Sequence, residues 1–122
     1  MRHTRQRDAI HSAFAAAGRP LSPQEALELA RRTVPQLGIA TVYRSIARLL
    51  ADGTLVSVEL PGSPSRYELA GLSHHHHFHC GSCGRVYDLP GCPGNMERLI
   101  PSGFKLERHE LVLYGNCAGC SG

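Results

Sequence analysis

No stretch of the sequence approaches the roughly 18 consecutive apolar residues that a membrane-spanning helix needs. The first eight residues, MRHTRQRD, lack the apolar core of a secretory signal peptide. There is no internal repeat, no HExxH pattern and no recognisable Ser-His-Asp order. These absences predict a cytoplasmic protein and argue against a membrane protein, a repeat array and a hydrolase.

The net charge of +3 is small, but its distribution is uneven. Residues 1–60 hold eight Lys and Arg against five Asp and Glu, whereas residues 61–122 hold five of each. Six of the eight histidines and all five cysteines lie beyond residue 70. In a reducing compartment, such cysteines favour metal ligation over disulfides. One half is therefore basic, and the other is rich in metal-binding side chains.

The first half carries the pattern of three helices. The first is expected from the capping hydroxyl of Thr4 to the stop at Gly18. The second begins with the capping box SPQE (22–25) and extends to about Arg32. The third, within 40–53, places apolar side chains on one face and arginines on the opposite side.

Two alternating strands follow, at 54–60 and 66–70, separated by the turn-rich PGSPS. Three helices followed by a β-hairpin predict a winged helix-turn-helix domain at 1–69, so the fold class is α+β. The segment 70–73 is the expected hinge. In such a domain the third helix enters the major groove, where Arg44 would meet guanine edges or phosphate. Thr41 and Tyr43 would supply a hydroxyl, a methyl group or a ring, and Arg48 would meet phosphates.

The remaining residues, 74–122, predict a small α/β module. Short strands are expected at 74–80 and 85–89, and at most a short helix at 95–100. A long alternating strand is expected at 104–115, and it is a candidate for pairing across a homodimer.

The strongest chemical signal is a pair of CxxC motifs, Cys80–Cys83 and Cys117–Cys120. A two-residue gap lets one tight turn direct two sulfurs at one ion, and zinc accepts four thiolates in a tetrahedron. A thioredoxin-like redox site would need a strand-to-helix setting, which Gly84-Arg85-Val86 does not provide. The motifs predict a structural zinc site.

The run His74–His77 is the second signal. A histidine tag would stand at a terminus, whereas this run is internal. On a strand, His74 and His76 point to one face while His75 and His77 point to the other. The run can therefore serve two different metal sites.

Together, several segments resemble the ferric uptake regulator family: TRQR (4–7), GIATVYRSIARLLADG (38–53), RYEL (66–69), HHHHFHCGSCGRVYDL (74–89) and the ending HELVLYGNCAGC (109–120). The resemblance extends over nearly the whole chain. It implies a metal-responsive transcriptional repressor with an N-terminal winged helix and a C-terminal dimerisation module, which binds palindromic operator DNA as a homodimer.

The resemblance also implies roles for individual residues. The four cysteines of the CxxC pairs match structural zinc ligands, and Tyr43 and Arg44 match a pair that contacts DNA. Arg2 matches a basic residue that reaches the minor groove.

A regulatory metal site at the hinge is implied through Glu68, His75 and His77. Many members place a histidine shortly before the second helix, where this chain has Gly18-Arg19-Pro20-Leu21. The site is therefore expected to be incomplete or to recruit Asp88 or His79.

A further site inside the module is implied through His74, His76 and His109. Its usual glutamate lies about eleven residues before the glycine matching Gly103, and counting back reaches Cys92. The alternative fourth ligand is Glu97.

A thiolate in a regulatory site selects zinc over ferrous iron. The chain is therefore expected to be most similar to the zinc uptake regulator branch, with sensing of iron, nickel or peroxide as alternatives. A zinc hydrolase using the histidine run with Glu68 as base, or a metal buffer, represents a different class. A metal-dependent gel shift distinguishes a repressor from both. No membrane and no small organic substrate are expected as partners.

Overall fold

The computed structural model describes the backbone of residues 2–121 and the side chains from Thr4 to Ser121. The fold is a mixture of helices and strands, and the chain divides into two compact units, Met1–Leu72 and Ser73–Gly122. Within the described part of the chain, none of the helices combines the length and apolar character needed to cross a membrane.

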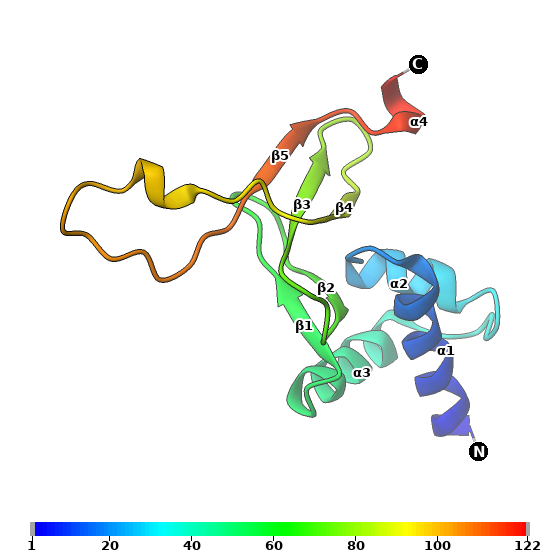
Figure 1. The fold of residues 1–122 in the computed structure, drawn as a ribbon. Helices are drawn as coiled ribbons and strands as arrows, with labels where there is room; N and C mark the ends of the chain where they lie inside the picture. Colours follow the sequence, from blue (N-terminus) through cyan, green and yellow to red (C-terminus); the bar gives the residue numbers. More distant parts are fainter. Residues whose placement is uncertain (1, 122) are drawn as a thin grey trace. The chain divides into compact units, whose positions relative to one another are not determined.

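Three helices form most of the first unit: α1 (Arg2–Ala17), α2 (Pro23–Ala30) and α3 (Ile39–Ala51) (Figure 1). Ile10 and Phe14 stand four residues apart on α1, and both are buried. Val42 and Ile46 repeat this spacing on α3 and join the same apolar cluster. The cluster fixes the helices against one another and leaves the other face of α3 exposed.

The start of α2 and the end of α1 lie where the sequence predicted them, whereas the start of α1 does not. The Ser22 hydroxyl accepts from the backbone N–H of Glu25, whose carboxylate accepts from Ser22 N–H, so the predicted capping box is present. Gly18 has φ of 62° just after α1, as expected for the residue that stops a helix. The prediction for Thr4 was wrong: it lies inside α1, because the helix begins at Arg2.

A hairpin completes the first unit. Strands β1 (Leu55–Val58) and β2 (Arg66–Leu69) pair antiparallel. Leu21 and Tyr67 exchange two backbone hydrogen bonds of 2.9 Å, which attach the segment before α2 to β2. Both predicted strands exist, although each is shorter than its sequence pattern.

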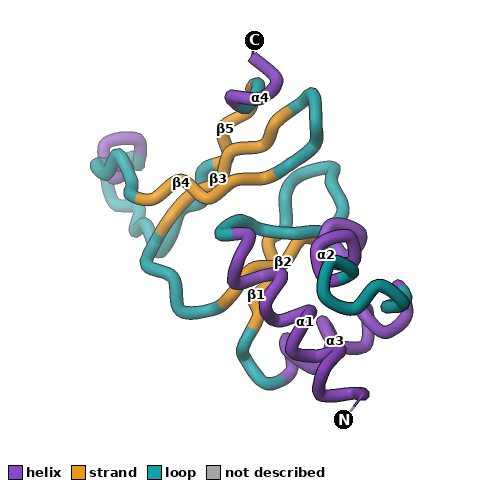
Figure 2. Tube along the Cα trace, turned by 90° about the vertical axis from the view of Figure 1, so that its right-hand side faces the viewer, coloured by secondary structure: helices purple, strands orange, loops and turns teal. Residues whose placement is uncertain are grey.

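The second unit contains a three-stranded sheet. Its strands are β3 (His75–Cys80), β4 (Val86–Pro90) and β5 (Val112–Gly115), in the order β4-β3-β5. The central β3 pairs antiparallel with β4 and parallel with β5, and Figure 2 shows it between them. A 3₁₀ helix η1 (Met96–Leu99) lies in the long connection to β5, and a short α4 (Ala118–Ser121) follows β5.

The expected long strand at 104–115 was wrong for most of its length, because only Val112–Gly115 is a strand. The register explains this result. Val112 pairs with His77, and β3 begins only two residues earlier, at His75. Residues 104–109 therefore have no neighbouring strand within the sheet, and alternation of side chains alone cannot supply backbone partners.

The second unit has very little hydrophobic core. Among its described residues, only Cys80 and Val86 are both apolar and buried. Its sheet brings the CxxC motifs together, since Cys80 ends β3 and Cys117 follows β5, the adjacent strand. A unit of this size with so small a core needs another source of stability.

Candidate metal centres and nucleic-acid interface

The four cysteines of the CxxC motifs lie together, with all four sulfurs within 4.8 Å of one another. Cys83 Sγ and Cys117 Sγ, from different motifs, are 3.8 Å apart. A tetrahedral zinc with Zn–S bonds of about 2.3 Å separates its sulfurs by about 3.8 Å. The donor set and its spacing therefore fit zinc.

The surroundings of these sulfurs favour a thiolate at Cys80 and disfavour one at Cys120. Cys80 is fully buried, and its sulfur accepts from the backbone N–H groups of Cys83 at 3.4 Å and Cys117 at 3.3 Å. These donors lower the pKa of Cys80 to about 5. The neighbouring Cys117 raises the pKa of Cys120 to about 12. The protein alone therefore does not ionise all four sulfurs, and a bound dication would release the remaining protons.

Supporting residues around this cluster were missed by the sequence analysis. The hydrogen bond between Tyr87 and Cys117 raises the pKa of the tyrosine and lowers that of the thiol, so the phenol donates to the sulfur. Ser82 Oγ donates to Asn116 Oδ1 at 2.7 Å, which connects the two CxxC loops. Such contacts orient metal ligands. The VYD and YGN segments carry no motif that would have identified them.

A second cluster lies on β3 and β4 of the second unit. His75 Nε2 and His77 Nε2 lie 3.2 Å and 3.3 Å from the same atom, Asp88 Oδ1. His75 Nδ1 is 2.8 Å from the Ser73 carbonyl, which can only accept, so Nδ1 carries the proton. In neutral His75, the Nε2 lone pair therefore faces a carboxylate. A shared cation would stabilise this arrangement, and the donors fit a divalent metal.

The other residues considered for the hinge site are placed as follows. Arg19 stands near the position where a histidine was expected, and its guanidinium donates to Glu25 at 2.9 Å. Glu68 is buried on β2 of the first unit. His79 shares the β3 face of His75 and His77, but its ring contacts Tyr114. Asp88, rather than His79, is therefore the residue beside the histidine pair.

A third cluster lies on the opposite face of β3. His109 Nε2 is 3.1 Å from both His74 Nε2 and Cys92 Sγ, and a ring nitrogen of His76 lies within 4.8 Å of these atoms. Cys92 comes from the loop after β4, and its sulfur also accepts from Gly94 N–H. Glu97 is exposed on η1 and is not part of the described cluster.

The buried member of this cluster is His76, which is 4% exposed. The Leu111 N–H donates to its Nδ1 at 3.2 Å, and its Nε2 is enclosed without a hydrogen-bond partner among the described residues. Burial lowers the pKa of His76, and the neighbouring histidines His74 and His109 lower it further. The ring is therefore neutral at pH 7, as a metal ligand must be. Because Nδ1 accepts from Leu111 N–H, the neutral ring carries its proton on Nε2, and a metal bound at Nε2 would need the other tautomer and would displace the Leu111 contact. The set of one thiol and three imidazoles is one that a soft divalent ion accepts.

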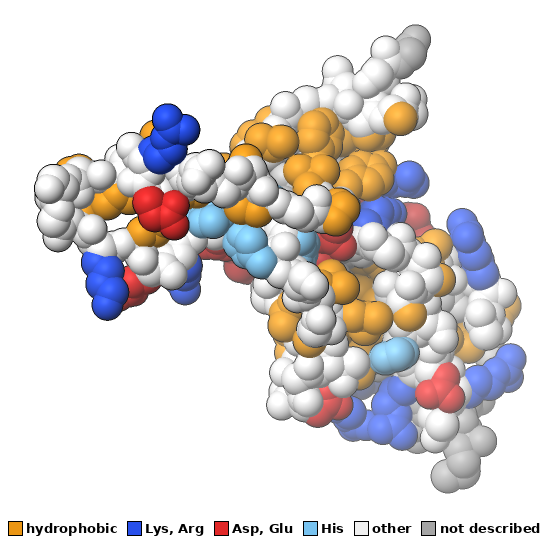
Figure 3. All heavy atoms as spheres, viewed as in Figure 1, with side chains coloured by type: hydrophobic (Ala, Val, Ile, Leu, Met, Phe, Trp, Pro, Cys, Tyr) orange, Lys and Arg blue, Asp and Glu red, His pale blue; other side chains and the backbone are white. Residues whose placement is uncertain are grey.

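Helix α3 presents its predicted DNA-contacting residues away from the core. Tyr43 is 56% exposed, and Arg44 and Arg48 are also exposed. Figure 3 shows basic side chains gathered on this face of the first unit, between α3 and the N-terminal turns of α1. The side chain of Arg2 lies outside the described residues.

Comparison with known proteins agrees with this architecture. The model of the family described as "Ferric uptake regulator family" matches residues 1–114. The transcriptional regulator FurA of Mycobacterium tuberculosis is 33% identical over 99% of this chain and 84% of its own length.

Two solved structures are also similar. The Helicobacter pylori ferric uptake regulator, described as having three functional metal-binding sites, superposes with a TM-score of 0.72 and 27% identity over 96% of this chain and 80% of its own. FurB of M. tuberculosis, described as a zinc uptake regulator, superposes with a TM-score of 0.55 and 28% identity over 98% of this chain and 95% of its own.

Proposed function

The chain belongs to the ferric uptake regulator family, whose members are metal-responsive transcription regulators that act as DNA-binding dimers, and we propose that it is a zinc-responsive repressor of palindromic operators. The observation that carries the choice of metal is the cluster of His74, His76, Cys92 and His109. Membership of a family of regulators also argues against the hydrolase alternative.

The three clusters would have different tasks, and His74, His76, Cys92 and His109 would hold a second zinc inside the module. The four cysteines, Cys80, Cys83, Cys117 and Cys120, would hold a structural zinc, which supplies the stability that the second unit lacks in its core. His75, His77 and Asp88 would hold the regulatory metal, with Glu68 as a further ligand. The H. pylori protein is described as having three functional metal-binding sites, which supports the proposal that this chain has more than one.

Zinc is favoured because Cys92 adds a thiolate to three imidazoles. His₃Cys is an acceptable tetrahedral set for zinc, whereas ferrous iron prefers histidines with carboxylates. The similarity to a zinc uptake regulator also supports this choice. Iron or nickel sensing is the alternative, and it would require the His75–His77–Asp88 cluster to take one of these ions in place of zinc.

Cobalt substitution tests whether Cys92 is a ligand. After zinc has filled the four-cysteine site, cobalt added to the wild-type protein should give a thiolate-to-cobalt charge-transfer band, and Cys92→Ser should abolish it. The sulfur lies 3.1 Å from His109 Nε2, slightly less than the separation of about 3.5 Å expected for these two ligands of one tetrahedral ion, so a small shift would let both bind it. Glu97→Gln is the matched control and should leave the band intact. Absence of the band from wild-type protein would remove the argument for zinc.

The first unit would bind DNA. We propose that α2 and α3 act as the helix-turn-helix and that the β1–β2 hairpin is the wing, which makes 1–69 the DNA-binding domain, 70–73 the hinge and 74–122 the dimerisation and metal-binding module. Thr41, Tyr43 and Arg44 would contact DNA in the major groove, with Arg44 on a guanine edge or a phosphate. Arg48 would contact phosphates, and Arg2 would reach the minor groove. The exposure of α3 supports this reading.

Arg44→Ala should weaken operator binding by about 1–3 kcal/mol if its guanidinium reads a base. The guanidinium donates to Thr41 Oγ1 at 3.0 Å, so it is partly oriented before DNA arrives. Fluorescence anisotropy at fixed salt with zinc-loaded protein measures the change. Arg32→Ala, at an exposed position after α2, is the control for charge alone. Unchanged affinity of the Arg44 variant would show that this side chain is not a reader.

The second unit would form the homodimer. Large apolar side chains are exposed on it, and a second copy would cover them: Leu99, Phe104, Leu113 and Tyr114. Exposed apolar groups of this number are typical of protein interfaces. A two-fold dimer places two copies of α3 on half-sites related by the same symmetry, which is why a palindromic operator is expected.

A further inference from the structure

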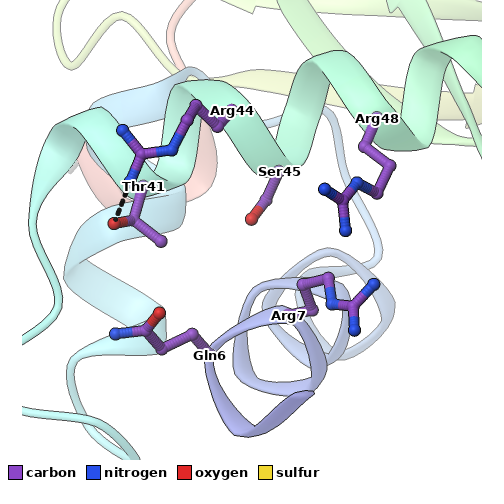
Figure 4. A pocket seen from close by; sticks show the side chains of 6 residues that line it. All are labelled: Gln6, Arg7, Thr41, Arg44, Ser45 and Arg48. Carbon is purple, nitrogen blue, oxygen red and sulfur yellow. Dashed lines mark hydrogen bonds between the residues drawn. The ribbon is translucent and has the colours of Figure 1, made fainter. Parts of the chain in front are cut away.

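Helices α1 and α3 enclose a basic pocket of about 420 Å³ on the first unit (Figure 4). Polar and basic side chains from both helices line it: Gln6, Arg7, Thr41, Arg44, Ser45 and Arg48. Three of these six carry guanidinium groups, and none carries a carboxylate. The pocket is therefore a concentration of positive charge with room for a ligand.

The sequence builds this pocket through helical spacing. Arg44 and Ser45 follow Thr41 by three and four residues, and Arg48 follows them by four and three, so the four side chains share one stripe of α3. Ser45 is only 6% exposed, and Figure 4 shows its hydroxyl pointing into the space between the two helices. Because serine is small, its side chain does not fill the space between the two helices. Arg7 stands opposite, on α1.

The charge inside the pocket is not neutralised by the protein. Among the described residues, none of Arg7, Arg44 and Arg48 forms an ion pair with a carboxylate. The pKa of Asp52 is lowered mainly by the hydrogen bonds it accepts from Thr54, and the charge of Arg48 makes a smaller contribution. Like charges around one cavity repel each other, and an anion between them relieves this repulsion.

A phosphodiester is the anion that matches this arrangement. Guanidinium groups form bidentate hydrogen bonds with phosphate oxygens, and two can approach one phosphate from different sides. The Arg44 guanidinium already donates to Thr41 Oγ1. Arg7 and Arg48 are therefore the two guanidinium groups of the pocket that are available to bind the phosphate from both sides. Figure 4 shows these two side chains extending into the same region from opposite helices.

We propose that this pocket binds one backbone phosphate of each operator half-site, held between Arg7 of α1 and Arg48 of α3. This inference rests on the proposed DNA-binding function and adds α1 to the DNA interface. Phosphate contacts fix the position of a protein on DNA. A phosphate held by both helices would set the depth and register of α3 in the major groove.

The test is a double-mutant cycle in which an arginine of the protein and a phosphate of the DNA are neutralised separately and together. The DNA is a duplex that zinc-loaded wild-type protein selects from a random pool, and single phosphates are replaced in turn by methylphosphonate. One position per half-site should weaken wild-type binding about tenfold, the cost of a lost charge-assisted contact. Arg7→Gln and Arg48→Gln should each weaken binding similarly, and the same methylphosphonate should then add little further loss.

Arg5→Gln is the matched control, because Arg5 is exposed on α1 but does not line the pocket. It removes the same charge, and the effect of the methylphosphonate should stay near tenfold. If the wild-type protein binds the duplex, but no methylphosphonate position has an effect that is lost in Arg7→Gln, the phosphate site is wrong while the proposed function stands. Failure of zinc-loaded wild-type protein to select any DNA would overturn the proposed function and this inference with it.

Discussion

Replacing Cys80 with serine is expected to unfold the second unit. Zinc binding to four-cysteine sites contributes on the order of 10–16 kcal/mol, as much as the whole stability of many domains. Serine is nearly isosteric and can still accept the N–H groups of Cys83 and Cys117, so the loss would come from the metal. Circular dichroism, thermal melting and zinc content per chain measure the result. Cys117→Ser should behave in the same way.

Cys92→Ser is the control within the same unit, because Cys92 is exposed and lies outside the four-cysteine cluster. It should keep the structural zinc and a folded second unit. A folded, dimeric Cys80→Ser protein with unchanged thermal stability would contradict the structural assignment. The small core of this unit, with only Cys80 and Val86 as buried apolar residues among those described, explains why so large an effect is expected.

The parts of the fold that sequence predicted well depend on local chemistry. The capping box at Ser22 and Glu25 is present because both hydrogen bonds close within one helical turn. The two CxxC motifs lie together at the ends of the adjacent strands β3 and β5, as expected for cysteines whose spacing matches one ion. The opposite faces of β3 follow from the period of two in any strand.

The parts that sequence could not predict depend on partners distant along the chain. The segment 104–111 alternates like a strand, yet it is not one, because β3 is too short to accompany it. Tyr87 supports Cys117 through the register of the sheet, which no pattern in VYDL reveals. For the same reason, sequence left Asp88 and His79 as alternatives, and only the pairing of β3 with β4 places Asp88 opposite His77.

The largest effect on regulation is expected from Asp88→Asn. Its Oδ1 atom lies within 3.3 Å of both His75 Nε2 and His77 Nε2, so this one oxygen provides the anionic part of the cluster. An amide keeps the shape of the side chain but supplies no negative charge to balance a dication. Coupling between two binding sites typically changes affinity by about 5- to 150-fold. The variant should therefore lose most of the zinc-dependent gain in operator affinity.

Operator titrations at controlled free zinc would measure this gain, with the four-cysteine site loaded in every sample. Glu97→Gln is the matched control, since it removes one carboxylate of the same unit outside the cluster. It should respond to zinc like the wild type, and both variants should keep the wild-type melting temperature. If Asp88→Asn retained the full response while Cys92→Ser lost it, the regulatory role would belong to the opposite face of β3. Zinc would then act through His74, His76 and His109, and the His75–His77–Asp88 cluster would have no part in sensing.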